Sequence, residues 1–377
     1  MNKLILYFIF LNLFNIIYTS SEDLSTYYKT YIKENGYNLE EHAVKTEDGY
    51  ILSLWHLEPK TSPKKVAYFQ HGLADTAWCF FQMEKKSLPF LLMEEGFDIW
   101  LGNSRGNIFS NKYKSNLRKE FYNFTMDDEV KYDLPAMIKY INSNTNGKKI
   151  SYLSHSQGST IFFMLYMHNP KLVESSIENF FSVGTVPNIA NAVFTPIKFL
   201  DSIYGIFEFL DFKDGILNLS DEQRLLVSNF CKELPNVCKI FFELGACIRP
   251  SGKTNYNKVY NFMYYYPGGT SQQNLLHWSQ IHTEKKLVYF NKNYQKEKKA
   301  IPYNIEILKN WKIKALVVRT DDDTFSSYED VTQLYNLVKN KNYMKILDVK
   351  NYGHLDVLNA DSAYNDIFLP LIEFLKN

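Results

Sequence analysis

Short apolar runs alternate along the chain with stretches whose apolar spacing is typical of helices. From about residue 48 onward these runs are Val66–Phe69, Phe97–Leu101, Ile150–Leu153, Ala315–Val318 and Lys345–Val349. Strands alternating with helices indicate βαβ units and a mainly parallel sheet. Each run ends in a polar or Gly-containing loop, and open parallel sheets bind ligands beyond the carboxyl ends of their strands. We therefore expect an α/β fold with its functional site at that edge.

The alternation lapses between about Thr185 and Lys309. This segment holds a cluster of cysteines, the aromatic run Phe262–Tyr266 and a Pro-Gly-Gly turn. It is interpreted as a mostly helical insertion between two halves of one α/β core. We expect a leader at residues 1–20, a first core part at 21–186, a helical cap at 187–309 and a second core part at 310–377.

The N-terminus has the layout of a secretory signal peptide. The basic Lys3 precedes the apolar run Leu4–Tyr18 and the small residues Thr19–Ser21. A membrane anchor is the alternative, but the run is shorter than the roughly 20 apolar residues that span a bilayer. We expect cleavage near Thr19–Ser21 and a secreted or lysosomal protein. In that pathway Asn123 and Asn218, which both head N-x-S/T triplets, are candidate glycosylation sites.

Charge and cysteine content exclude several classes of partner. Lys and Arg number 42 against 41 Asp and Glu, a net charge of +1, which argues against nucleic acid as the main partner. Aromatic residues make up 16% and suit a large core or an apolar cleft.

Of the four cysteines, Cys231, Cys238 and Cys247 lie close together in the sequence, which in an oxidising compartment suggests one local disulfide. Without a C-x-x-C pair or a suitably spaced His, we expect no structural zinc.

The strongest chemical signal is Ser156, which lies between an apolar run and a helix-compatible stretch. A nucleophile elbow needs a sharp strand-to-helix turn with small residues two positions before and after the nucleophile. Gly158 meets this requirement, and Ser154 stands where the usual pattern has Gly. A serine-rich turn before a helix is the alternative interpretation. The pattern predicts Ser156 as a nucleophile.

A serine nucleophile requires a base that a carboxylate orients, and in this fold the order is Ser, acid, His. His354 follows the last predicted strand, where the base belongs, and the acidic run Asp321–Asp323 follows the strand before it. The pattern alone leaves the choice among the three Asp open. The backbone N–H groups of Gln157 and of Leu73, in the loop after an early strand, are the candidate oxyanion donors.

Several blocks of sequence, in order, resemble the acid lipase family, which includes gastric and lysosomal acid lipases. The resemblance covers about Tyr37 to the C-terminus and rests on Val44–Leu52, Phe69–Leu73, Asp98–Asn107, Asp133–Ala136, His155–Gly158, Gln273–Gln280 and Gly353–Asp356. It implies an α/β-hydrolase core with a helical cap and a mobile lid, the lid falling within Phe212–Cys247. It also implies Ser156 as nucleophile, His354 as base, Leu73 and Gln157 as oxyanion donors, and Asp323 as the acid, with Asp322 as a fallback.

The resemblance further implies a lid disulfide between Cys238 and Cys247. Cys231–Cys238 is the rival pair, which a continuous helix would separate by about 10.5 Å along its axis. Pro235 disfavours such a helix, so the rival pair stays open. The chain departs from the family at Ser154, in the acid loop and at Gly353, but no catalytic group is lost.

We expect a serine lipase that hydrolyses triacylglycerol or sterol esters through an acyl-enzyme. Neither a metal nor an organic cofactor is implied, and the expected partners are the lipid ester and, transiently, a lipid interface that the cap or lid contacts. No stable protein partner and no nucleic acid are expected. The alternatives are a carboxylesterase for short soluble esters and an inactive lipid-binding hydrolase fold. A metal-dependent hydrolase using His277, His282 and Asp321–Asp323 is disfavoured, because a five-residue gap does not place two His on one helical face.

Overall fold

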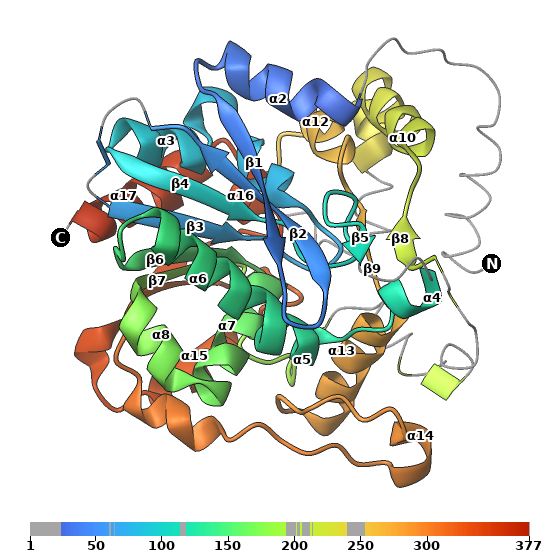
Figure 1. Cartoon of the computed structure of the whole chain (residues 1–377), viewed down its shortest axis with the longest axis vertical. Coiled ribbons are helices and arrows are strands. Elements are labelled where there is room, and N and C mark those ends of the chain that lie inside the picture. Colours follow the sequence, from blue (N-terminus) through green and yellow to red (C-terminus); the bar gives the residue numbers. More distant parts are fainter. Residues whose placement is uncertain are drawn as a thin grey trace.

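The predicted strands form a single large sheet in the computed structural model of the chain (Figure 1). The structure describes residues 24–59, 62–63, 65–113, 118–193, 201, 204–205, 212, 214–239 and 253–376. The strands are β1 (Leu39–Lys45), β2 (Tyr50–Leu57), β3 (Lys65–Gln70), β4 (Phe97–Gly102), β5 (Lys112–Tyr113), β6 (Ile150–His155), β7 (Ile177–Val183), β8 (Ile216–Asn218), β9 (Gly268–Thr270), β10 (Lys314–Thr320) and β11 (Met344–Val349). The predicted leader at residues 1–20 lies outside the described residues.

Helices separate most of these strands. They are α2 (Leu24–Glu34), α3 (Leu88–Glu94), α4 (Arg118–Phe121), α5 (Met126–Asp128), α6 (Leu134–Asn144), α7 (Gln157–His168), α8 (Pro170–Ser176), α10 (Asp221–Glu233), α12 (Val259–Met263), α13 (Gln272–Glu284), α14 (Tyr294–Glu297), α15 (Tyr328–Leu337), α16 (Asp356–Asn359) and α17 (Leu369–Lys376). A π-helical turn, Glu129–Asp133, joins α5 to α6. No helix among the described residues is long and apolar enough to cross a bilayer.

The large sheet runs in the order β1-β2-β4-β3-β6-β7-β10-β11, with β5 paired to β2. Every pair from β4 to β11 is parallel, whereas β1, β2 and β5 join in antiparallel fashion. The predicted α/β fold with a mainly parallel sheet is confirmed. β7 and β10 are neighbours although residues 184–313 lie between them, so this long segment leaves the sheet and returns to it.

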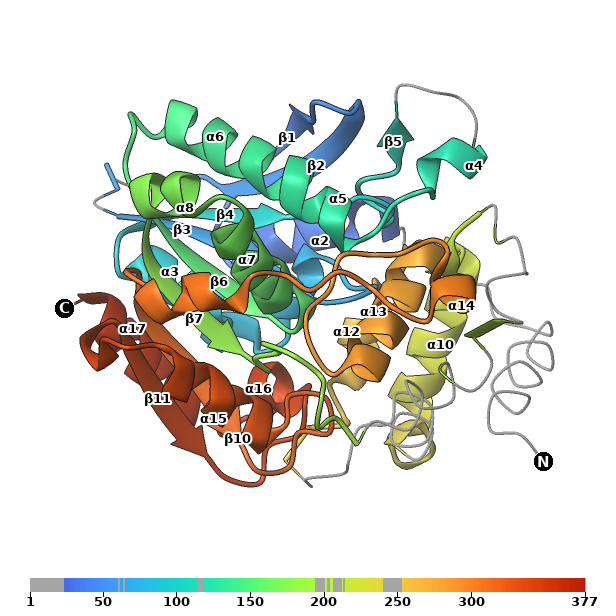
Figure 2. The ribbon, with the colours of Figure 1, turned by 90° about the horizontal axis from the view of Figure 1, so that it is seen from below.

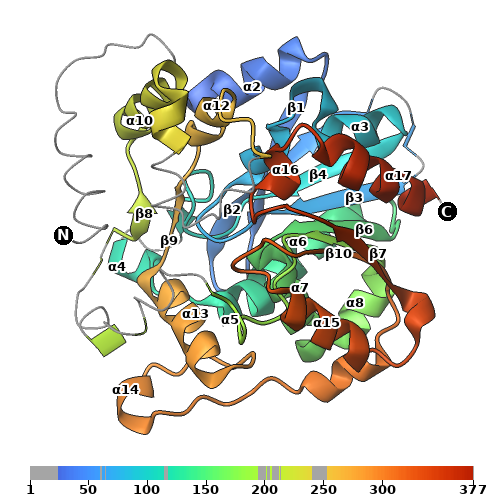
Figure 3. The same cartoon turned by 180° about the vertical axis from the view of Figure 1, so that it is seen from behind.

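Helices cover both faces of the sheet, which explains why its central strands are apolar on both sides. Along β3, Val66 and Tyr68 pack into the core beneath α6, α7, α8 and α15, while Ala67 and Phe69 pack into the core beneath α2, α3, α16 and α17. Figures 1 and 3 show these two helical layers from opposite sides. α10, α12 and α13, which come from the segment between β7 and β10, lie beyond one end of the parallel strands (Figure 2).

Candidate active site

Ser156 lies in a strained turn between β6 and α7. Its φ of 53° and ψ of −123° lie in a region that non-glycine residues rarely adopt. The turn is held by hydrogen bonds from Ser156 N–H to the Val183 carbonyl (3.3 Å) and from Ser159 N–H and Oγ to the Ser156 carbonyl (2.8 and 2.6 Å). This over-determined backbone projects the Ser156 side chain from the end of the sheet.

The small residues around Ser156 are explained by close backbone approaches. A Cβ at Gly158 would lie 2.4 Å from the Gln70 carbonyl oxygen, so α7 begins directly against the end of β3. A Cβ at Gly72 would lie 2.9 Å from Ser156 Cβ, which places the loop after β3 beside the serine. Ser154, the departure from the family pattern, is buried and donates its hydroxyl to the Phe181 carbonyl at 3.2 Å. The fold therefore accommodates this serine with its polar atom paired.

The structure brings Ser156, His354 and Asp323 together from three separate loops. His354 Nε2 lies 2.8 Å from Ser156 Oγ, and His354 Nδ1 lies 2.7 Å from Asp323 Oδ2. The second carboxylate oxygen, Oδ1, accepts the N–H groups of Phe325 and Ser326 at 2.8 and 2.9 Å. With Nδ1–H donating to Asp323, Nε2 is free to accept the serine proton. Within the acidic run it is thus Asp323 that contacts the imidazole.

The fallback acid Asp322 is half-buried, and its backbone N–H approaches Thr320 Oγ1 at 3.5 Å. Asp321 is exposed and accepts the N–H of Asn351 at 2.7 Å. Neither of these contacts involves His354, whose imidazole is hydrogen-bonded to Asp323.

Two further histidines lie behind the serine and stay neutral. Burial lowers the pKa of His155 to about 3 and that of His71 to about 4. His155 Nε2–H donates to the His354 carbonyl at 3.1 Å, which ties the end of β6 to the loop that carries His354. His71 Nδ1–H donates to the Gly72 carbonyl at 2.8 Å, while its Nε2 accepts the N–H of Ser104 at 3.0 Å.

The Gly72 carbonyl points toward the His71 side chain. Because the peptide between Gly72 and Leu73 is trans, the Leu73 N–H points away from that side chain. Neither this N–H nor that of Gln157 donates a hydrogen bond within the described part of the chain. Free N–H groups close to a serine hydroxyl are what the stabilisation of an oxyanion requires.

The side chain of Gln157 connects the sheet to the inserted segment. Its amide nitrogen donates to Glu129 Oε1 at 3.0 Å, and its oxygen accepts the indole N–H of Trp278 at 2.8 Å and the amide of Asn274 at 3.3 Å. Burial, together with the nearby Asp133 carboxylate, raises the pKa of Glu129 to about 8. The position of Gln157 thus depends on both the sheet and the inserted segment.

Arg105 links three of the family-like sequence blocks. Its buried guanidinium forms ion pairs with Asp133 Oδ1 (2.6 Å) and Asp48 Oδ2 (2.8 Å) and stacks over the Tyr50 ring at 4.0 Å. Three blocks far apart in sequence therefore meet at one cation, beneath the loop that carries Ser104. Pattern reasoning did not identify this cluster, although all its members lie in the quoted blocks.

The residues of the disfavoured metal-dependent mechanism have separate partners. His277 is buried in α13 and contacts the Val288 carbonyl at 2.7 Å, while His282 contacts Asp201 at 2.5 Å.

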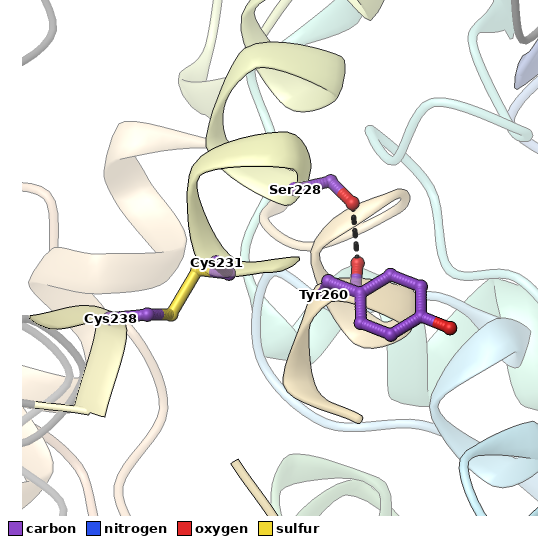
Figure 4. The surroundings of a disulfide bond; sticks show 4 residues. All are labelled: Ser228, Cys231, Cys238 and Tyr260. Atoms are coloured by element: carbon purple, nitrogen blue, oxygen red, sulfur yellow. Dashed lines mark hydrogen bonds between the residues drawn. A yellow bond between two sulfur atoms is a disulfide. The ribbon is translucent and has the colours of Figure 1, made fainter. Parts of the chain in front are cut away.

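The predicted disulfide is wrong in the structure. Cys231 pairs with Cys238 rather than Cys238 with Cys247, and Cys247 lies outside the described residues (Figure 4). α10 ends at Glu233, and Leu234 leaves the helical conformation with φ −129° and ψ 61°, just before Pro235. A new helical turn at 235–239 then folds back, so the two Cα atoms are 4.9 Å apart. Ser228, one turn earlier, anchors α10 by donating to the Tyr260 carbonyl at 2.7 Å.

The two candidate glycosylation sites lie on the surface. Asn123 is exposed and accepts the amide of Gln273 at 2.7 Å. Asn218 in β8 is exposed and donates to the Tyr122 hydroxyl at 3.0 Å. Both side chains are accessible, and their modification stays a prediction.

Comparison with known families gives two overlapping matches. Residues 28–84 match the family described as a partial alpha/beta-hydrolase lipase region, and residues 68–360 match the alpha/beta hydrolase fold. Among curated relatives, lipase member K of Homo sapiens is 31% identical over 91% of this chain and 90% of its own. Gastric triacylglycerol lipase of Mus musculus is 31% identical over 90% and 89%. Lysosomal acid lipase/cholesteryl ester hydrolase of Homo sapiens is 32% identical over 90% and 88%.

Solved structures share the fold at low sequence identity. An esterase from Exiguobacterium antarcticum covers 90% of this chain and all of its own with a TM-score of 0.53 and 11% identity. A bromoperoxidase from Bacillus anthracis gives 0.52 and 13% identity over the same shares. At such identity these similarities concern the fold alone.

Proposed function

The chain belongs to the acid lipase family of α/β hydrolases and is a lipid ester hydrolase, and we propose that Ser156, His354 and Asp323 are its catalytic triad. Ser156 Oγ attacks the ester carbonyl while His354 Nε2 takes the hydroxyl proton. Asp323 holds the imidazole by Nδ1 and stabilises the imidazolium. The N–H groups of Leu73 and Gln157 stabilise the oxyanion of the tetrahedral intermediate.

The intermediate collapses when His354 returns the proton to the alcohol, which leaves an acyl group on Ser156. Water then attacks this acyl-enzyme as His354 removes its proton, and the fatty acid is released. The observation that carries this proposal is the continuous chain of contacts from Ser156 Oγ through His354 to Asp323, at 2.8 and 2.7 Å.

We propose triacylglycerols or sterol esters as substrates, because the names of two relatives specify those lipids. In this proposal residues 187–309 form a cap that contacts the lipid interface, with the lid inside Phe212–Cys247. Exposed Phe212, Leu217, Leu234 and Val237 offer apolar surface there. The core parts at 21–186 and 310–377 carry the triad.

The secretory pathway is the proposed route of the protein, since its relatives include a gastric and a lysosomal enzyme. The layout of residues 1–20 and the disulfide between Cys231 and Cys238 agree with that route.

Hydrolysis of fatty esters of increasing chain length, at pH 5 and pH 8, tests the function. The proposal predicts turnover of long-chain esters that Ser156→Ala abolishes. Activity confined to short soluble esters would instead favour a carboxylesterase. Absence of Ser156-dependent turnover at both pH values would contradict the enzymatic proposal and favour a lipid-binding role.

A further inference from the structure

A cluster of potential metal ligands lies on the β1–β2 hairpin, between the sheet and α6. Glu40 and His42 are two residues apart on β1 and so share a face, and the strand register places His56 of β2 directly opposite Glu40. One ligand atom from each of the three lies within 4.8 Å of the other two. The spacing of Cys and His in the sequence led us to expect no structural zinc, because only the hairpin register unites these three residues.

The two imidazoles present unpaired nitrogens to the Glu40 carboxylate. His42 Nε2 lies 3.4 Å and His56 Nδ1 3.9 Å from Glu40 Oε2. Both nitrogens are buried, and neither has a hydrogen-bond partner in the described part of the chain. An unpaired buried polar atom costs about 1–3 kcal/mol, so two that face one carboxylate need an explanation.

The opposite nitrogen of each imidazole is held in place by another side chain. His56 Nε2 lies 2.6 Å from Asp98 Oδ1, and the ring stacks on Trp100 with a centroid distance of 3.9 Å. His42 Nδ1 lies 3.0 Å from the Tyr140 hydroxyl of α6. Because Nε2–H of His56 donates to Asp98, the neutral form of the ring has its lone pair on Nδ1, which faces the Glu40 carboxylate.

A cation bound between the two imidazoles and the Glu40 carboxylate would give the unpaired nitrogens a partner. Histidines that bind zinc commonly donate their other N–H to a carboxylate, which fixes the tautomer and the ring orientation. Zinc bonds of about 2.0–2.2 Å place neighbouring ligand atoms roughly 3.3–3.5 Å apart. The contacts of 3.4 and 3.9 Å approach that spacing, and Glu40, whose side chain is 55% exposed, has room to complete it.

We propose that Glu40, His42 and His56 bind a divalent transition metal ion of the zinc type, with Asp98 and Tyr140 orienting the two imidazoles. Two His and one Glu leave a fourth position for water. The ion joins β1 to β2 on the antiparallel side of the sheet, whereas the proposed triad lies in loops after β6, β10 and β11. Its expected role is to stabilise the hairpin rather than to take part in ester hydrolysis.

Zinc titration of the full, chelator-treated chain by calorimetry tests the site, with Co²⁺ absorption as a second readout of tetrahedral geometry. We expect one ion per chain. Glu40→Gln should weaken binding at least tenfold, and Asp98→Asn by about 10- to 100-fold. Glu47→Gln makes the same charge change at an exposed position after β1 and should leave the affinity unchanged.

Thermal melting gives an independent check, because a ligand that binds only the folded state raises Tm. Zinc should raise Tm of the wild type and of Glu47→Gln but not of Glu40→Gln. Since Glu40 is exposed, its variant is expected to fold. Absence of stoichiometric binding, or equal affinity in Glu40→Gln and Glu47→Gln, would overturn the proposal.

Discussion

Gly158→Ala tests whether the contact between α7 and β3 positions the active site. The new Cβ would lie 2.4 Å from the Gln70 carbonyl oxygen and 2.9 Å from that of His71, and both atoms belong to the backbone. Cβ atoms essentially never come closer than 3.0 Å to another heavy atom. The start of α7 and the end of β3 must therefore separate by roughly 0.6 Å, because no side chain can rotate away to relieve the contact.

This displacement acts on both halves of the proposed oxyanion hole. β3 leads into the loop that carries Leu73, and α7 begins with Gln157. A misplacement of 1 Å near the chemistry can cost about 100-fold in rate, so we expect kcat to fall by about 10- to 100-fold. Overpacking costs about 1–3 kcal/mol, whereas Ala in an unobstructed helix would be favoured over Gly by about 1 kcal/mol. A fall in stability would therefore indicate the tight contact with β3, whereas a gain would indicate that α7 is unobstructed at this position.

The assay measures kcat on a soluble short-chain ester, well below Tm, together with Tm itself. Gly205→Ala is the matched control, because its new Cβ would meet nothing closer than 3.7 Å and its backbone needs no positive φ. The control should keep its activity and its Tm. If Gly158→Ala matched the control in both, the proposed packing of the elbow against β3 would be refuted.

Three other predictions follow from the site and its surroundings. Asp323→Asn should lower kcat by about 10⁴-fold, whereas Asp322→Asn should change it little, and equal losses would contradict the choice of acid. Burial raises the pKa of Glu129 from 4.5 to about 8, so the stability that its proton provides is full below pH 4.5 and is lost as pH rises toward 8. Urea unfolding at pH 5 and pH 8 should therefore show a smaller pH dependence in Glu129→Gln than in the wild type, and parallel pH dependences would contradict this. Peptide mapping without reduction should recover Cys231 linked to Cys238, and a peptide linking Cys238 to Cys247 would contradict the observed pairing.

The parallel core could be predicted from sequence because its signal is local. Runs such as Val66–Phe69 and Ala315–Val318 are buried on both faces, and they therefore read as continuous apolar segments ending in polar loops. The antiparallel hairpin β1–β2 gave a weaker signal. Its outer strand, β1, includes Glu40, Glu41 and His42, whose polar side chains obscure the alternation of an edge strand.

The residues of the proposed triad could be placed because each follows a strand end. Ser156 comes directly after β6 and His354 lies in the loop that follows β11, and parallel topology brings such strand ends together. The choice of Asp323 over its neighbours depended on family resemblance, since three successive carboxylates are equivalent in any pattern. Only the fold distinguishes them, by directing one side chain toward the imidazole.

Contacts between distant segments could not be predicted from the pattern. The ion pairs of Arg105 and the link from Gln157 to Trp278 depend on how residues far apart in sequence pack. The prediction of the disulfide was wrong for a local reason. The chain reverses its direction at Leu234 and Pro235 and so brings Cys231 to Cys238, which an unbroken helix would keep apart.

Covalent capture of the nucleophile tests the central claim most directly. The purified protein would be incubated with a long-chain alkyl phosphonate ester, which mimics the tetrahedral intermediate, and its intact mass and peptides would be measured. We predict a single adduct on Ser156, with none on the Ser156→Ala variant and greatly slowed labelling in a His354→Ala variant. An adduct on another serine, or no adduct on a folded protein, would contradict the proposal that Ser156 is the nucleophile.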